Sequence, residues 1–176
     1  MLALYLGISG VLHPSESTYE LVEGRSPWRD GHALYEAAPW LAAALRPWPD
    51  VRVVLTSSQP RLKGMPAVLR LLGDELAARV VGNTFEDLTT KARRGPMQRP
   101  LSTDDYWRLN TSELVRSHVQ WLKPSAWVAV NDDSILWTAE ERAQHLVEAD
   151  GCKGLLDSAT QDRLLTVLRG NFGPEP

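Results

Sequence analysis

Polar residues follow three apolar segments of this sequence. The segment Leu2–Leu6 runs into small residues that include Ser9, Val51–Leu55 runs into Thr56-Ser57-Ser58, and Trp127–Val130 runs into Asn131-Asp132-Asp133. Hydroxyl groups donate and accept hydrogen bonds, and carboxylates accept them or carry a proton. His13 and His32 have no second His or Cys at ligand spacing, so the sequence does not support a zinc site.

The run from Leu2 to Pro14 resembles the first motif of the haloacid dehalogenase (HAD) phosphatase superfamily, whose usual form is apolar-Asp-apolar-Asp-Gly-Val-Leu. The His-Pro pair after Leu12 resembles the HAD branch associated with bacterial RNA-repair proteins. In that family the first Asp is the nucleophile that takes the phosphoryl group, and the second is the general acid/base. This sequence has Gly7 and Ser9 at these two positions. The resemblance therefore implies a phosphatase scaffold without its two reacting carboxylates.

The resemblance covers about residues 2–168 and extends to a second motif. Val51–Ser58 is similar to the apolar strand of the family that ends in Ser or Thr, where the hydroxyl and nearby amides hold a phosphate. It implies phosphate-binding roles for Thr56 and Ser57, together with Ser9 and Gly10. A polar residue follows the second strand in most doubly wound proteins, so this motif alone is weak evidence for the family. Its spacing from the first motif is what supports the resemblance.

Residues Trp127–Asp133 are similar to the fourth motif, in which paired acids hold magnesium. Asn131 stands where the first acid is expected, and Asp132 and Asp133 remain as the implied metal ligands. Two adjacent acids after a strand equally form a solvated turn or a helix cap. Magnesium is commonly held by one or two carboxylates with waters and substrate phosphate, so without a carboxylate at Gly7 we expect weak Mg²⁺ binding that depends on a phosphate.

The basic residue of the third motif has several candidates. Arg116, on the predicted helix before the fourth strand, is the first candidate and Lys91 the second; for each, a plain surface position is the alternative. Arg61 is a further candidate: the family usually has Trp-Arg after the second motif, where this chain has Gln59-Pro60-Arg61. The segment 91–99 carries four cations, which indicates either a solvated surface or a contact with a phosphate backbone or an acidic partner.

These substitutions change the chemistry that the site can perform. Transfer through an aspartyl-phosphate needs a carboxylate oxygen in line with phosphorus, and Gly7 has none. Removing a nucleophile from a coupled catalytic set costs about a millionfold in rate in a well-studied protease. The loss of two negative charges also reduces repulsion of an anion, so we expect the pocket to hold phosphate more readily than an active enzyme does.

Strand and helix signals alternate along the chain, which predicts an α/β protein with a parallel sheet of about five strands, doubly wound and Rossmann-like. The HAD resemblance implies the strand order 5-4-1-2-3, a ligand site at the carboxyl ends of the central strands, and a minimal cap or none. We expect a single domain over residues 1–176, with a loop at residues 14–31 and a long loop at residues 83–110.

Composition limits the class of protein. The chain has 176 residues, a net charge of −3 and one cysteine, Cys152, so no internal disulfide forms and no global charge draws it to nucleic acid or to an anionic membrane. No apolar run has the length of a membrane span and no basic region precedes the first apolar stretch, which predicts a cytoplasmic protein without a membrane partner.

Three functional hypotheses remain open at this point. The first is a HAD-like pseudoenzyme of the RNA-repair-associated branch that binds a phosphorylated ligand, an RNA end or a protein partner. The second is an active magnesium-dependent phosphohydrolase that uses rearranged acids such as Asp132 or Asp133. The third is a protein-binding module of the inhibitor or immunity type that reuses the fold.

Overall fold

Five parallel strands form the centre of the protein. The structure is a computed structural model that describes residues 1–90 and 100–174. The strand order β3-β2-β1-β4-β5 confirms the α/β doubly wound fold and the predicted order. The strands are β1 (Leu2–Leu6), β2 (Val51–Leu55), β3 (Val80–Asn83), β4 (Ala126–Asn131) and β5 (Leu146–Glu148).

Apolar residues cover both faces of the central strand β1. Leu4 and Leu6 face one hydrophobic cluster, and Ala3 and Tyr5 face another, because successive side chains of a strand point to opposite faces. All four are fully buried, which explains why β1 has a continuous apolar run instead of an alternating one. Both faces of the sheet are therefore covered, and its carboxyl edge is left to carry the site.

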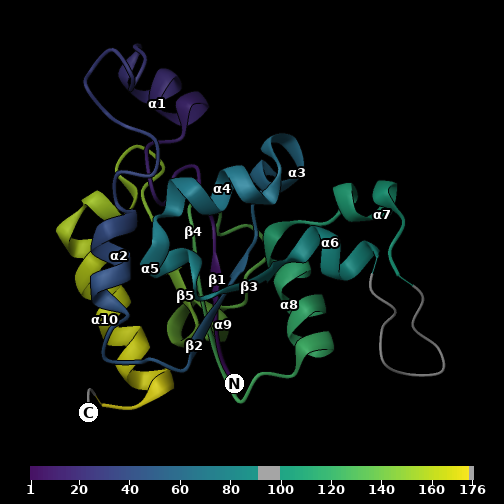
Figure 1. Ribbon diagram of the computed structural model, residues 1–176. Helices are drawn as coiled ribbons and strands as arrows, with labels where there is room; N and C mark the ends of the chain where they lie inside the picture. The colour runs from purple at the N-terminus through teal and green to yellow at the C-terminus, as the bar shows by residue number, and fades with distance from the viewer. Residues whose placement is uncertain (91–99, 175–176) are drawn as a thin grey trace.

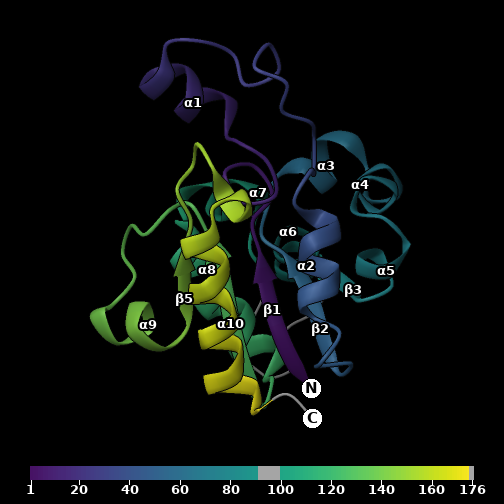
Figure 2. The same cartoon turned by 90° about the vertical axis from the view of Figure 1, so that its left-hand side faces the viewer.

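Helices pack on the two faces of the sheet (Figures 1 and 2). Helices α2, α4, α5 and α10 supply the larger cluster, which contains Leu41, Val68, Leu76 and Leu164, and α8 supplies Val115 to the smaller one. The helices are α1 (Glu16–Glu23), α2 (Ala38–Ala44), α3 (Gln59–Lys63), α4 (Met65–Leu72), α5 (Asp74–Ala77), α6 (Thr84–Thr89), α7 (Thr103–Arg108), α8 (Thr111–Leu122), α9 (Ala139–Gln144) and α10 (Ser158–Phe172), with a 3₁₀ turn at Gly154–Leu156.

Two segments predicted as loops contain helices. The prediction of a loop at residues 14–31 is wrong, because α1 lies within it and projects beyond the carboxyl edge of the sheet (Figure 2). The prediction of a structureless loop at 83–110 is also wrong, since α6 and α7 lie within it. Asn83 and Ser102 cap these two helices by accepting hydrogen bonds from the main-chain N–H groups of Glu86 and Asp105.

Among the residues that the structure describes, no helix is both long enough and apolar enough to cross a membrane.

Candidate functional site

The ends of β1, β2 and β4 bring the predicted motifs to one edge of the sheet. Gly7 follows β1, and its main-chain N–H donates to the carbonyl of Val130 at 2.9 Å. On the other side, the N–H of Thr56 donates to the carbonyl of Leu6, also at 2.9 Å. Gly7 therefore lies between the residues that end the two neighbouring strands, as the doubly wound topology requires.

Asn131 has its amide group beside Gly7. A Cβ atom at Gly7 would lie 3.1 Å from Asn131 Nδ2 and 3.0 Å from a methyl group of Val11. The other amide atom, Oδ1, accepts a hydrogen bond from the N–H of Asp133 at 3.1 Å, which fixes the orientation of the side chain. The Asn131 side chain is only 7% exposed, so a neutral N–H donor faces the position where the resemblance implies a nucleophilic carboxylate.

The hydroxyl oxygen of Thr56 is buried and has no hydrogen-bond partner among the described residues. Buried hydroxyl groups are nearly always paired with protein or with ordered water, so this one is available to a water molecule or to a ligand. Within the described part of the chain, no hydrogen bond is formed by the main-chain N–H groups of Ser9 and Ser57 either. The N–H of Gly10 differs, because it donates to the carbonyl of His13 at 2.8 Å and is not free for an anion.

Gln59 connects the loop after β1 to the loop after β2. Its side-chain amide donates to the hydroxyl of Ser9 at 3.1 Å, and its main-chain N–H donates to the hydroxyl of Ser57 at 3.2 Å. The hydroxyl of Tyr35 donates to Gln59 Oε1 at 2.8 Å, and the N–H of Tyr35 donates to the Nδ1 atom of His13 at 3.2 Å. This network holds Ser9, Ser57 and Gln59 in one arrangement.

Three ionisable groups around this network have shifted pKa values. Burial, and then the positive charge of Lys63, lowers the pKa of His13 to about 4, so the ring is neutral at pH 7. Burial raises the pKa of Tyr35 to about 12. Burial, followed by the charge of Asp133, raises the pKa of Asp132. Lys63, which is exposed, is a cation close to the site that the sequence reasoning missed.

Of the two predicted metal ligands, Asp132 lies at the site. Its carboxylate abuts Gly10, where any side chain would overlap with it. The Asp133 carboxylate accepts a hydrogen bond from the N–H of Ile135 at 2.8 Å, which is the turn-forming role that the sequence left open. In the described residues, no three His, Cys, Asp or Glu side chains cluster in a way that could hold a metal ion. Of the two predicted ligands, Asp132 is the one whose carboxylate accepts no hydrogen bond from another described residue, so a Mg²⁺ ion there would need waters and ligand phosphate to complete its coordination.

The two predicted basic residues that the structure describes, Arg116 and Arg61, both have partners within the protein. Arg116 donates to both carboxylate oxygens of Glu141 at 2.6 Å and to the carbonyl of Leu136 at 2.6 Å, so its guanidinium already has an anionic partner. Lys91, with the basic segment 91–99, lies outside the described residues. Arg61 contacts the rings of Phe85 and Trp107.

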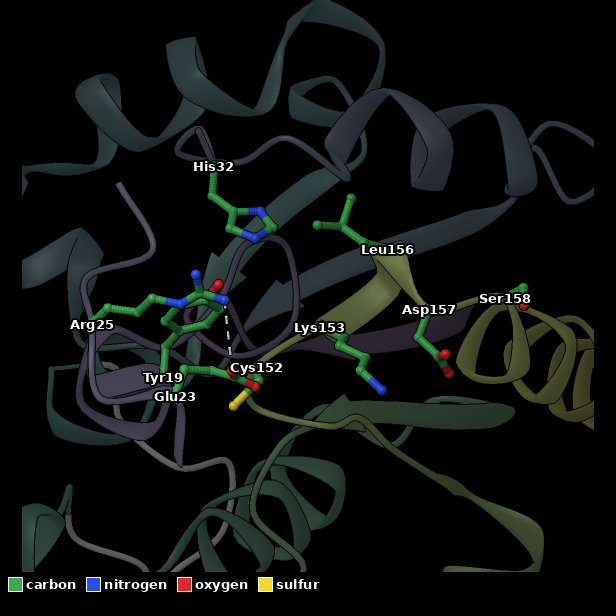
Figure 3. A pocket seen from close by; sticks show the side chains of 9 residues that line it. All are labelled: Tyr19, Glu23, Arg25, His32, Cys152, Lys153, Leu156, Asp157 and Ser158. Atoms are coloured by element: carbon green, nitrogen blue, oxygen red, sulfur yellow. Dashed lines mark ion pairs between the residues drawn. The ribbon is translucent and has the colours of Figure 1, made fainter. Parts of the chain in front are cut away.

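A separate cavity lies between the segment that contains α1 and the turn that follows β5 (Figure 3). Its volume is about 490 Å³, and its lining is Tyr19, Glu23, Arg25, His32, Cys152, Lys153, Leu156, Asp157 and Ser158. Its polar side chains have partners within the protein: Arg25 and the Tyr19 hydroxyl bind Asp30, and His32 binds Glu36. The cavity contains none of the residues predicted to bind phosphate, so it does not coincide with the strand-end site.

The comparisons agree with the fold and with the strand-end motifs. Residues 3–159 match the model of the family described as the HAD domain in Swiss Army Knife RNA repair proteins. The chain belongs to this family. No curated protein and no solved structure matches the chain. Membership confirms the resemblance drawn from the first motif, and it relates the chain to proteins of RNA repair.

Sequence reasoning found the positions of the motifs but missed the side chains that connect them. Ser9, Gly10, Thr56, Ser57 and Asp132 come to one edge, as predicted. Tyr35 and Gln59 were not assigned a role, because their contacts join residues 24 apart in sequence that no spacing pattern connects.

Proposed function

We propose that the protein is a HAD-like pseudoenzyme that binds a terminal phosphate group, on a small molecule or on an RNA end, without hydrolysing it. The observation that carries the proposal is the buried, unpartnered hydroxyl of Thr56 beside the end of β1. An anion there would accept hydrogen bonds from this hydroxyl, from Asn131 Nδ2 and from the free N–H groups of Ser9 and Ser57.

The absence of turnover follows from the groups at the reacting position. Gly7 offers no atom that could attack phosphorus, and the Ser9 hydroxyl accepts a hydrogen bond from the Gln59 amide. An amide cannot take the proton of a hydroxyl at neutral pH, so the group bonded to the Ser9 hydroxyl is not a base that would activate a serine nucleophile. The ligand is therefore expected to bind and to dissociate unchanged.

Magnesium has a secondary role in this proposal. Asp132 alone supplies an uncommitted carboxylate, and Mg²⁺ binds such a site only when ligand phosphate oxygens complete its coordination. Phosphate binding accordingly does not require the metal, and added Mg²⁺ raises the affinity modestly.

Calorimetric titration with inorganic phosphate in the absence of Mg²⁺ tests the proposal. We expect a dissociation constant of about 1 mM or lower for the unmodified protein. The variant Thr56→Val removes the hydroxyl with little change of shape, and it should weaken binding about tenfold or more, since a hydrogen bond to a charged group contributes about 1.5–3 kcal/mol. Thr166→Val on α10, whose hydroxyl bonds to the carbonyl of Asp162, is the matched control and should bind as the unmodified protein does.

Two outcomes would contradict the proposal. One is the absence of binding by inorganic phosphate and by phosphorylated compounds, which would favour a protein partner. The other is magnesium-dependent hydrolysis of generic phosphomonoesters that is lost in Asp132→Ala, which would favour the active phosphohydrolase.

A further inference from the structure

A cation–aromatic cluster lies at the edge of the sheet that carries the strand-end site. Arg61 on α3, Phe85 on α6 and Trp107 on α7 form it, and we call it the Arg61 cluster. The guanidinium carbon of Arg61 lies 5.2 Å from the ring centroids of both Phe85 and Trp107. The two rings are stacked, with centroids 5.8 Å apart and planes inclined by 28°.

Two residues of this cluster are close in sequence to the ends of β2 and β3. Arg61 is two residues beyond Gln59, whose side chain contacts Ser9. Phe85 is two residues beyond the end of β3, and β3 pairs with β2 in parallel. Because parallel strands end at the same edge, the cluster and the end of β2 share one side of the molecule, as the positions of α3, α6 and α7 show (Figure 1).

The cluster is open to solvent and keeps unused hydrogen-bond donors. Trp107 is 46% exposed, although a ring of this size is normally well covered. Arg61 is exposed, and its guanidinium forms no hydrogen bond or ion pair with the described residues. An indole face and an adjoining free guanidinium suit a ligand that has both a flat ring and negative charge.

Buried contacts of Tyr106 support the cluster. The ring of Tyr106 packs edge-on against both Phe85 and Trp107, with centroid distances of 5.0 and 5.2 Å. Its hydroxyl is hydrogen-bonded to the hydroxyl of Thr84 at 2.8 Å, and the residue is buried with Leu88. A fixed aromatic surface loses little conformational entropy when a ligand binds.

We propose that the Arg61 cluster is a stacking subsite for a base of a single-stranded RNA whose terminal phosphate binds at the end of β1. Trp107 stacks on the base, and Arg61 donates from its free N–H groups to a backbone phosphate. Recognition of this kind tolerates any base, because every base has a π face. The inference rests on the proposed function for the terminal phosphate, while the stacking surface is a separate site.

Fluorescence titration with a short single-stranded RNA, with and without a terminal phosphate, tests the subsite. Trp107→Ala should weaken binding of the RNA about tenfold, as expected for the loss of one base–aromatic stack. Trp107→Phe should recover most of the affinity, and Arg61→Ala should weaken binding as Trp107→Ala does. Inorganic phosphate should bind all three variants as it binds the unmodified protein.

A neighbouring arginine provides the control for charge. The side chain of Arg108, next to Trp107 on α7, is 80% exposed, and its variant Arg108→Ala removes the same charge without touching the stack. We expect a much smaller effect from this change. Equal losses of RNA affinity in Arg61→Ala and Arg108→Ala would show that Arg61 acts only through general electrostatic attraction. That result would overturn the subsite.

The outcomes separate this inference from the proposed function. If Trp107→Ala binds RNA as the unmodified protein does while Thr56→Val loses inorganic phosphate, the stacking subsite is wrong and the phosphate site stands. If Trp107→Ala loses RNA while Thr56→Val has no effect on any ligand, the subsite stands and the phosphate site is wrong. If RNA does not bind at all, the exposed cluster belongs to a contact with another protein and the inference fails.

Discussion

The atoms around Gly7 are packed so tightly that a side chain added there would affect the stability of the protein as well as its chemistry. The nearest atoms to a Cβ at this position are the methyl group of Val11 at 3.0 Å and Asn131 Nδ2 at 3.1 Å. These neighbours would have to move by a few tenths of an ångström to admit even one carbon. The surroundings of Gly7 are thus adapted to glycine, and a carboxylate cannot be added there without a structural adjustment.

We therefore predict that Gly7→Ala lowers the free energy of unfolding by about 1–3 kcal/mol, the usual cost of overpacking. It should also weaken phosphate binding, because Asn131 must shift. Gly170→Ala on α10 is the control: a Cβ there meets nothing within 4 Å, so the change should stabilise the protein by about 0.5–1 kcal/mol. Chemical denaturation measures both. An unchanged or increased stability of Gly7→Ala would contradict this packing argument.

The lowered pKa of His13 predicts how the stability of the fold changes at acidic pH. Its folded-state pKa of about 4 lies below its ordinary value of 6.5, so the unfolded chain binds a proton before the folded protein does. The contribution to stability is present above pH 6.5 and is lost as the pH falls toward 4, by at most about 3 kcal/mol. His13→Asn keeps an acceptor for Tyr35 and removes the titration.

Denaturation at a series of pH values between 7 and 4 measures this effect. The variant is expected to be less stable at pH 7, because the ring no longer packs against Trp28 and Tyr35. Its stability should nevertheless fall less steeply with acid than that of the unmodified protein. Parallel pH profiles for the two proteins would show that His13 does not titrate as described.

At the scale of elements, the Arg116–Glu141 pair joins α8 to the start of α9. Its bidentate contact lowers the pKa of Glu141 from 4.5 to about 2. The pair therefore stabilises the fold above about pH 4.5 and is lost as the pH falls toward 2. Glu141 also accepts a hydrogen bond from the main-chain N–H of Thr138 at the start of α9.

We predict that Glu141→Gln reduces the free energy of unfolding by about 1–3 kcal/mol at pH 7, the range for hydrogen bonds to charged groups. Glu140→Gln, on the same helix turn and exposed, should change stability by less than about 0.5 kcal/mol. Thermal denaturation at pH 7 and pH 3 measures both, and the difference between the variants should shrink at pH 3. Equal stabilities of the two variants at pH 7 would rule out a structural role for the pair.

Elements with a clear apolar pattern could be predicted from the sequence, and short helices without such a pattern could not. Val51–Leu55 has the predicted bounds because an apolar run defines it, and the helix predicted to carry Arg116 is Thr111–Leu122, which a capped amphipathic pattern defines. The helix α1 was missed because Leu21 and Val22 are exposed and only Tyr19 is buried, so no apolar face is visible. The helices α6 and α7 are too short for a helical period, although their caps at Asn83 and Ser102 were readable signals.

The candidate site was predictable to a similar extent. Motif positions placed Ser9, Thr56 and Asp132 at strand ends, and the topology then brought them together. The partner of Arg116 could not be inferred, because Glu141 is 25 residues away and no spacing pattern connects the two. The assignment of Arg116 to phosphate remains a prediction. Arg116 would have to leave Glu141 to bind a phosphate, and the structure shows no ion pair for Lys63 among the described residues.

At the scale of the whole molecule, the carboxyl edge of the sheet holds two surfaces of complementary chemistry. Neutral donors gather where β1, β2 and β4 end, and a cation–aromatic cluster lies beyond the end of β3. The net charge of −3 means that no global charge draws the protein to a nucleic acid, so an attraction would come from a local group of residues. A phosphorylated RNA end would contact both surfaces, whereas a small phosphorylated molecule would use only the first.

A crystal structure of the protein soaked with phosphate in the absence of Mg²⁺ tests the central claim most directly. We predict a phosphate ion at the end of β1, within hydrogen-bonding distance of the Thr56 hydroxyl and of Asn131 Nδ2, with Gly7 beneath it. Crystals of Thr56→Val treated in the same way should lack the ion. A phosphate found only in the cavity lined by Arg25 and Lys153, or none at the strand ends, would contradict the account.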